Sequence, residues 1–104
     1  MKKLTDLLPK ELAPGLTGYY AHGKSMSLGL VDIKAGSILP AHQHIHEQIT
    51  YILEGRLDMI IGSQPVSLTA GMYYVIPSGT VHSATAITDC QVIDAFCPVR
   101  EDYQ

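Results

Sequence analysis

The chain has 104 residues, of which 46% are hydrophobic and 16% charged, and this balance excludes intrinsic disorder. Its seven Lys and Arg residues are scattered along a chain of formal net charge −3, which gives no basic stripe for nucleic acid. No apolar run approaches the roughly 20 residues that span a bilayer. The N-terminal MKKLTDLLPK lacks the apolar stretch of a signal peptide. We therefore expect one cytoplasmic domain, residues 1–104, without nucleic-acid or membrane partners and with Cys90 and Cys97 reduced.

Residues 1–18 are expected to form an N-terminal extension. The pattern around Leu4–Leu8 is compatible with a short helix, which Pro9 would end. Pro14–Gly15 then indicates a loop.

From Tyr19 onward the pattern is that of β-strands. Short apolar or alternating runs are separated by turn residues. Examples are Met26–Ile33, Gln48–Leu53, Leu57–Ile61, Met72–Ile76 and Gln91–Phe96. Many short strands without a helical period predict an all-β sandwich or barrel. Glu54–Gly55 lies between two apolar runs and predicts a hairpin turn.

Histidines are concentrated in one short segment. His42, His44 and His46 alternate, so in a regular strand all three would project from one face. His82 follows the tight turn Pro77–Gly79. Alternation alone is also compatible with exposed histidines on a surface strand.

The spacing around these histidines resembles the two motifs of the cupin family. The first runs Gly36-x5-His42-x-His44-x3-Gln48-x6-Gly55, and the second runs Gly71-x5-Pro77-Ser-Gly-Thr-Val-His82. The resemblance implies a double-stranded β-helix (jelly-roll), a small barrel with its core at residues 31–98. Two departures are present, since Gln48 stands where Glu is usual and Ala86 where Asn is usual.

In cupins the motif histidines and the acidic position converge on a metal. The resemblance thus implies one divalent transition metal, such as Ni, Mn, Fe or Zn, held by His42, His44, Gln48 and His82, and imidazoles suit these ions. Gln in place of Glu leaves the ion its full positive charge and favours anionic ligands. The third ligand stays open, because parity favours His46 equally and Glu47 is intrinsically a better ligand than an amide. Glu47 is alternatively an orienting group for an imidazole or a surface charge.

A second group of residues follows near the C-terminus. Asp94 and Phe96 share one strand face, and an ionised Asp among apolar neighbours is costly unless it is paired or placed at a site. An edge strand with Asp94 toward solvent and Phe96 in the core would explain both without function. Arg100 is either an exposed residue or a clamp for a carboxylate.

Here the sequence resembles the KdgF-type small cupins, on the Glu47-Gln48 pair and the tail Asp94-x-Phe96-x-Pro98-x-Arg100-Glu-Asp-Tyr. That family linearises 4,5-unsaturated monouronates from pectin and alginate breakdown. The resemblance implies a metal held by three His and one Gln and a small anionic sugar substrate. It also implies that Asp94 moves protons and that Phe96 packs on the sugar ring. Arg100 would either pair with the substrate carboxylate or lie behind the residues that contact the substrate.

Two other classes of function remain open. One is another metal cupin enzyme, such as an iron-dependent dioxygenase, against which the neutral Gln48 argues. The other is a non-enzymatic metal- or sugar-binding module, which would tolerate loss of Asp94. We expect a homodimer, because small barrels with exposed edge strands often pair. Neither the metal nor the sugar epimer follows from the sequence.

Overall fold

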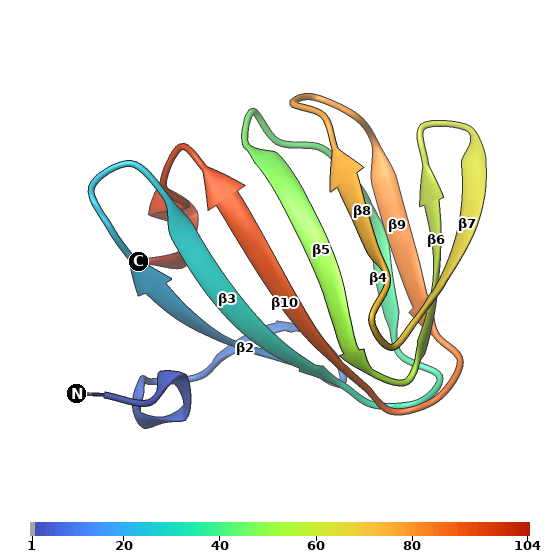
Figure 1. The fold of residues 1–104 in the computed structure, drawn as a ribbon, viewed down its shortest axis with the longest axis horizontal. Helices are drawn as coiled ribbons and strands as arrows, with labels where there is room; N and C mark the ends of the chain where they lie inside the picture. The colour runs from blue at the N-terminus through green and yellow to red at the C-terminus, as the bar shows by residue number, and fades with distance from the viewer. Residues whose placement is uncertain (1) are drawn as a thin grey trace.

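The computed structural model describes residues 2–104, in which two antiparallel sheets face each other as a small open-mouthed barrel (Figure 1). The larger sheet has the strand order β1-β2-β3-β10-β5-β8, with bounds Lys10–Ala13, Leu16–His22, Ser27–Ile33, Cys90–Cys97, Glu47–Glu54 and Tyr73–Ile76. The smaller sheet has the order β4-β9-β6-β7, with bounds Ile38–His42, His82–Ala86, Arg56–Ile61 and Gln64–Thr69. The expected all-β jelly-roll is therefore confirmed.

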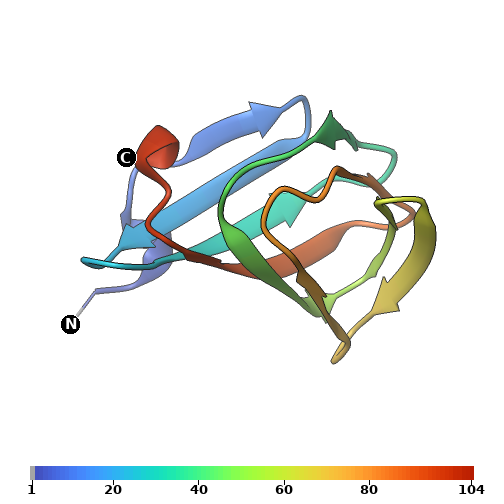
Figure 2. The ribbon, with the colours of Figure 1, turned by 90° about the horizontal axis from the view of Figure 1, so that it is seen from above.

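Strict alternation places one face of each long strand in the interior. In β5 the side chains of Gln48, Thr50 and Ile52 are buried, and those between them are exposed. The apolar core lies between the sheets at the end away from the mouth, where Ile52 and Val92 are almost completely buried. Polar inward-facing residues occupy the other end of the same strands. Figure 2 shows the two layers from above.

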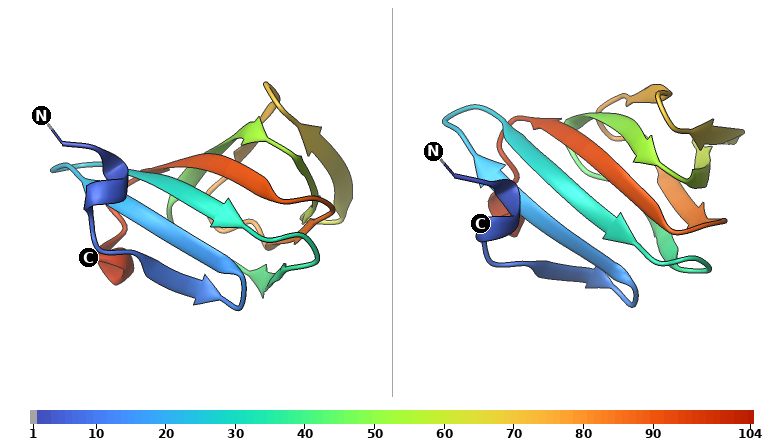
Figure 3. Two further views of the ribbon diagram at one scale, coloured as in Figure 1. Left: turned by 90° about the horizontal axis from the view of Figure 1, so that it is seen from below. Right: turned by 60° about the horizontal axis from the view of Figure 1, so that its bottom comes forward.

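The ends of the chain are tied to the larger sheet. The helix expected around Leu4–Leu8 is only the three-residue 3₁₀ turn η1, Leu4–Asp6, and a second such turn, η2, spans Glu101–Tyr103. Strand β1 and the start of β2 were not predicted, and β2 pairs with β3 along its whole length. The C-terminal segment returns beside β2, where His22 Nε2 lies 3.2 Å from the carbonyl oxygen of Tyr103 (Figure 3). Across residues 2–104, no helix is long and apolar enough to cross a bilayer.

The strand positions confirm the predicted runs, but one predicted connection is wrong. Glu54–Gly55 is not a hairpin turn, because β5 and β6 belong to different sheets. Gly55 has a φ of 91°, and its turn carries the chain from one layer to the other. Two-residue hairpin connections lie instead between β6 and β7, where Ile61 pairs with Gln64, and between β1 and β2, where Ala13 pairs with Leu16. Cys90 and Cys97 are free and lie at opposite ends of β10, as expected for reduced thiols.

Candidate metal centre

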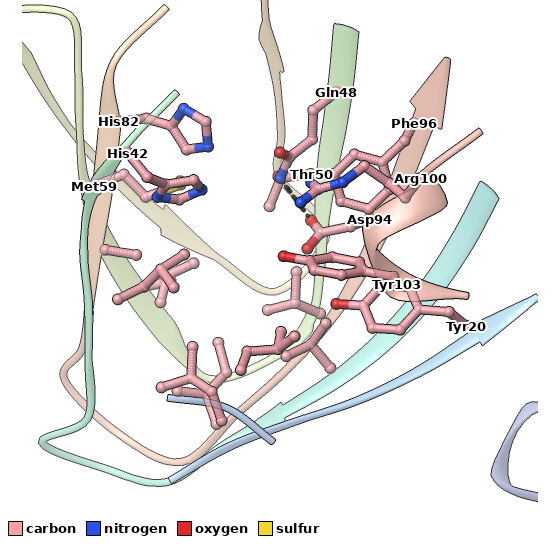
Figure 4. A pocket seen from close by; sticks show the side chains of 18 residues that line it. Tyr20, His42, Gln48, Thr50, Met59, His82, Asp94, Phe96, Arg100 and Tyr103 are labelled. Carbon is pink, nitrogen blue, oxygen red and sulfur yellow. Dashed lines mark hydrogen bonds between the residues drawn. The ribbon is translucent and has the colours of Figure 1, made fainter. Parts of the chain in front are cut away.

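Three histidines meet at the mouth of the barrel. His42 ends β4 and His82 begins β9, and the two residues pair across the smaller sheet. His44 follows in the loop between the sheets, and one ring nitrogen of each of the three lies within 4.8 Å of the others. Figure 4 shows His42 and His82 side by side on one wall of the pocket. Strand pairing and a short loop thus bring together residues from both motifs.

The three imidazoles share one protonation pattern. Their Nδ1 atoms lie 3.0, 3.0 and 2.8 Å from the carbonyl oxygens of Pro40, His46 and Thr80. A carbonyl oxygen only accepts hydrogen bonds, so each Nδ1 carries the proton and each Nε2 presents a lone pair. The Nε2 atom of His82 is buried and has no hydrogen-bond partner. Such an arrangement suits a metal ion bound through Nε2.

Burial keeps two of these imidazoles neutral. Burial, with smaller contributions from the positive charges of Arg100 and His82, lowers the pKa of His44 to about 4. Burial also lowers the pKa of His82. At neutral pH both rings therefore offer a free lone pair, which is the form that binds metals.

Gln48 is the first inward-facing residue of β5. Its Nε2 donates hydrogen bonds to Thr50 Oγ1 (2.9 Å) and Asp94 Oδ1 (3.2 Å). Its Oε1 lies 3.1 Å from His44 Nε2, so two lone pairs face each other. The opposite amide orientation would relieve that contact but place Oε1 against the Asp94 carboxyl. A cation shared by Gln48 Oε1 and His44 Nε2 would resolve the conflict, and the residues present therefore fit a bound metal ion.

The other candidates for the third ligand lie elsewhere. His46 is buried outside the cluster, and its Nε2 donates to the carbonyl oxygen of Val99 (3.1 Å). Glu47 is exposed, opposite Cys97 of β10. The expectation of one regular strand carrying three histidines is wrong, because β4 ends at His42 and β5 begins at Glu47. His46 instead fastens the C-terminal segment to the rim of the pocket.

Asp94 lies on the inner face of β10, a central strand between β3 and β5, and not on a solvated edge. Thr50 Oγ1 donates a hydrogen bond of 2.8 Å to its carboxyl oxygen, in addition to the bond from Gln48. Burial raises the pKa of Asp94 to about 6, although these hydrogen bonds and the charge of Arg100 oppose the rise. The carboxyl group can thus take up and release a proton near neutral pH.

Arg100 is buried beside Asp94 in the same pocket. Its Nε and Nη2 atoms bond both carboxylate oxygens of Asp102, at 2.9 and 2.8 Å. Its guanidinium carbon lies 3.9 Å from the ring centre of Tyr103 and 4.7 Å from that of Phe96. This packing fixes the guanidinium, and its hydrogen bonds to Asp102 use one of its two edges. Phe96 itself is buried, with its ring against His44.

Several pocket residues were not found from the sequence. The only feature in the sequence that could have identified Thr50 as a pocket residue is its position two residues after Gln48, which places both on one strand face. For Asp102 the only such feature is its position two residues after Arg100. Tyr20 lines the pocket from β2, where its ring lies over Gly18 and Gly29. A β-carbon at either glycine would collide with that ring. This signal needs the tertiary structure, because Gly29 belongs to the neighbouring strand.

Comparisons with known proteins agree with this geometry. Residues 29–96 match the family model described as Cupin domain. The chain is 31% identical over 75 residues to the pectin degradation protein KdgF of Dickeya dadantii, covering 70% of this chain and 68% of that protein. The structure of KdgF from Halomonas sp. superposes with a TM-score of 0.88 at 29% identity, covering 96% and 94% of the two chains. An RmlC-like cupin from Shewanella frigidimarina has a TM-score of 0.92 at 24% identity, covers 100% and 95%, and shows the shared fold alone.

Proposed function

The chain belongs to the cupin family, and from that premise we propose that it is a metal-dependent enzyme that converts 4,5-unsaturated monouronates into linear keto-uronates. The KdgF relatives support the substrate class, because pectin breakdown yields unsaturated uronates. The observation that carries the proposal is the contact between the two clusters. Gln48 lies against His44 on one side and bonds Asp94 on the other, so a metal ligand and a proton-transfer group are neighbours.

The Nε2 atoms of the three histidines and Oε1 of Gln48 would hold one divalent ion. When bound, this ion supplies a Lewis acid that stabilises negative charge on a substrate oxygen. All four ligands are neutral, so they offset none of the charge that attracts an anionic sugar. The identity of the ion stays open among Ni, Mn, Fe and Zn.

Asp94 is the proposed acid and base. The substrate is a cyclic enol ether and hemiacetal, and it opens when a proton adds at C4 and water adds at C5. The neutral carboxyl of Asp94 gives a proton to C4, and its carboxylate takes one back from the water as the water oxygen bonds to C5. When the bond between C5 and the ring oxygen then breaks, the new C5 hydroxyl becomes the keto group and its proton passes to the ring oxygen, so no redox cofactor is consumed. Hydrogen bonds from Thr50 and Gln48 hold the carboxyl group in place.

Arg100 is the proposed partner of the substrate carboxylate. Asp102 occupies one edge of the guanidinium, and the other edge is the one proposed to meet the substrate. Phe96 forms the wall between Arg100 and His44 and limits the width of the pocket for a sugar ring. The cytoplasmic location and the homodimer stay predictions.

The test follows the loss of ultraviolet absorbance at the C4=C5 bond, with each epimer of the unsaturated uronate and with spontaneous opening as background. Wild type should exceed the background, and Asp94→Asn should lose roughly 10²–10⁴-fold of that acceleration while keeping its metal. If wild type only matches the background, uptake of oxygen with candidate substrates would favour a dioxygenase. Sugar binding without turnover would favour a binding module. An equally active Asp94→Asn would refute the role of Asp94 alone.

A further inference from the structure

Two polar residues that the proposed reaction does not use lie next to the main chain of Arg100. His22 ends β2 and Ser27 begins β3, and the strand register pairs these two residues with each other. The register also pairs Ser27 with Phe96 of β10, and Phe96 with Gln48 of β5. Ser27 is only 1% exposed, although serines are mostly exposed in folded proteins. A polar side chain buried this completely requires hydrogen-bond partners.

Both residues bond the main chain of the C-terminal segment. The amide N–H of Arg100 donates a buried hydrogen bond of 2.8 Å to Ser27 Oγ. Ser27 Oγ lies 2.8 Å from His22 Nδ1, and His22 Nε2 lies 3.2 Å from the carbonyl oxygen of Tyr103. A carbonyl oxygen only accepts hydrogen bonds, so the neutral imidazole of His22 carries its proton on Nε2, and its Nδ1 accepts the hydroxyl proton of Ser27. The hydroxyl of Ser27 thus has one donor and one acceptor as partners.

The side chain of Arg100 is held by other groups. Asp102 accepts two hydrogen bonds from the guanidinium, which also lies over the rings of Tyr103 and Phe96. Asp102 and Tyr103 belong to the same short segment as Arg100, so they orient the guanidinium within that segment and do not place the segment against the sheet. The position of the guanidinium in the pocket therefore depends on what holds residues 99–104 to β2 and β3.

The bond from Ser27 is the attachment made to Arg100 itself. The bond from His46 reaches Val99, one residue earlier, and the bond from His22 reaches the residue three positions later. Because the bond from Ser27 is buried, its loss would leave an amide N–H without a partner and away from water, which costs more than the loss of a surface bond. A binding group that is already ordered loses less entropy when its ligand arrives.

We propose that Ser27 and His22 are positioning residues for Arg100, which fix the main chain of the C-terminal segment so that the guanidinium faces a carboxylate ligand before it binds. Ser27 acts on the Arg100 amide directly. His22 takes the hydroxyl proton of Ser27 and holds the carbonyl group of Tyr103. Across residues 2–104, the side chains that line the pocket include neither positioning residue. The inference rests on the role proposed for Arg100 and concerns how that side chain is held in place.

The first experiment observes Arg100 directly and needs no substrate. The chain has two arginines, Arg56 and Arg100, so the side-chain Nε–H groups give two signals to assign in a nitrogen–proton NMR spectrum. The protein is loaded with zinc, which is diamagnetic. Exchange of the buried Arg100 Nε proton with water should be slow in wild type and at least about 10-fold faster in Ser27→Ala and in His22→Phe. The exposed Arg56 is the internal control.

The second experiment titrates the same zinc-loaded proteins with galacturonate and with its uncharged methyl ester. Ser27→Ala should raise the dissociation constant for galacturonate about 10-fold and leave that for the ester unchanged, because a guanidinium pairs with a carboxylate. In Arg100→Gln, the further change Ser27→Ala should add little, since residues that act through one another are not additive. Ser83→Ala, a matched change in β9 of the other sheet, should alter neither constant.

Unchanged exchange at Arg100 in both Ser27→Ala and His22→Phe would overturn the proposal. An equal loss for the ester, or full additivity with Arg100→Gln, would also overturn it, because either result shows a general loosening of the pocket. If Arg100→Gln binds galacturonate as well as wild type does, the carboxylate role proposed for Arg100 fails, and the exchange rates alone decide whether Ser27 and His22 hold that side chain. Circular dichroism checks the fold of each variant, and His22→Phe serves should Ser27→Ala fail to fold.

Discussion

An amide at position 48 changes both the charge of the candidate centre and the hydrogen bonding of Asp94. Gln48→Glu would keep an oxygen next to His44 but replace the Nε2 donor to Asp94 with a second acceptor. We expect the variant to retain metal and to bind anionic substrate more weakly, with KM raised about 10-fold or more, because a negative ligand offsets part of the field of the ion. Elemental analysis and steady-state kinetics measure the two effects separately. An unchanged KM would show that the charge at position 48 does not control substrate binding.

The ligand assignment has a test that does not depend on any substrate. Purified without chelator, wild type should carry about one transition metal ion per chain, whereas His44→Ala and His82→Ala should lose most of it. His46→Ala should keep the ion, because His46 Nε2 bonds Val99 and lies outside the cluster. Gln48→Ala should weaken metal binding more than His46→Ala does. The reverse order would identify His46 as the third ligand, and full metal content in both His44→Ala and His82→Ala would refute the site.

The resemblance of the two spaced motifs to those of cupins predicted which histidines meet, whereas alternation alone did not distinguish His46 from the others. Residue types and spacing were not sufficient for Thr50 and Asp102. Thr50 matters through a hydrogen bond to a residue 44 positions away, and Asp102 through its orientation of Arg100. Neither leaves a mark in local sequence, because a threonine in a strand and an aspartate in a tail are ordinary residues. The contacts that give these two residues their roles can be seen only in the folded structure, where distant segments of the chain meet.

At the scale of elements, alternation predicted most strands but not the sheet to which each belongs. Both layers bury their inner face against one shared interior, so β5 and β6 show the same period of two on either side of Glu54–Gly55. A turn within a sheet and a turn between sheets therefore look alike in sequence. Strand β1 was missed for another reason, since it has four residues and only partly buried side chains beside an exposed one.

The turn at Gly55 provides a test of how the chain crosses between the layers. Gly55 has a φ of 91°, and a β-carbon there would collide with the carbonyl oxygen of Asp89. Gly36 has a φ of 83° but nothing within 4 Å of the same position, so it is a matched control for backbone strain alone. Gly36→Ala should cost about 1 kcal/mol of unfolding free energy, and Gly55→Ala about 1–3 kcal/mol more. Equal losses in urea denaturation would show that the turn at Gly55 shifts enough to avoid the collision with Asp89.

The interior of the whole barrel has two parts, an apolar part that stabilises the fold and a polar part that contains the candidate site. The closed end is filled by apolar side chains, whereas the mouth contains three imidazoles, an amide and a carboxyl group. Hydrogen bonds offset part of the free energy that burying these polar groups costs, and a ligand, a metal ion or a proton offsets more of it. The groups proposed to carry out the reaction should therefore be those that destabilise the metal-free fold.

The stability cost of burying Asp94 can be measured in the protein after a chelator has removed the metal. Burial raises its pKa from 3.8 to about 6, so the folded state binds the proton more tightly than the unfolded state does. The contribution of Asp94 to the free energy of unfolding should then fall as pH rises from about 4 to above 6. His44, whose pKa is lowered to about 4, contributes the opposite slope over the same range, so the effect of Asp94 is read from the difference between wild type and Asp94→Asn. Asp94→Asn removes the charge and should raise stability at pH ~8 by about 2–3 kcal/mol, with little gain at pH ~4. Urea denaturation of both proteins in chelator at the two pH values measures this difference, and a gain of equal size at both would show that packing, rather than charge, sets the cost of Asp94.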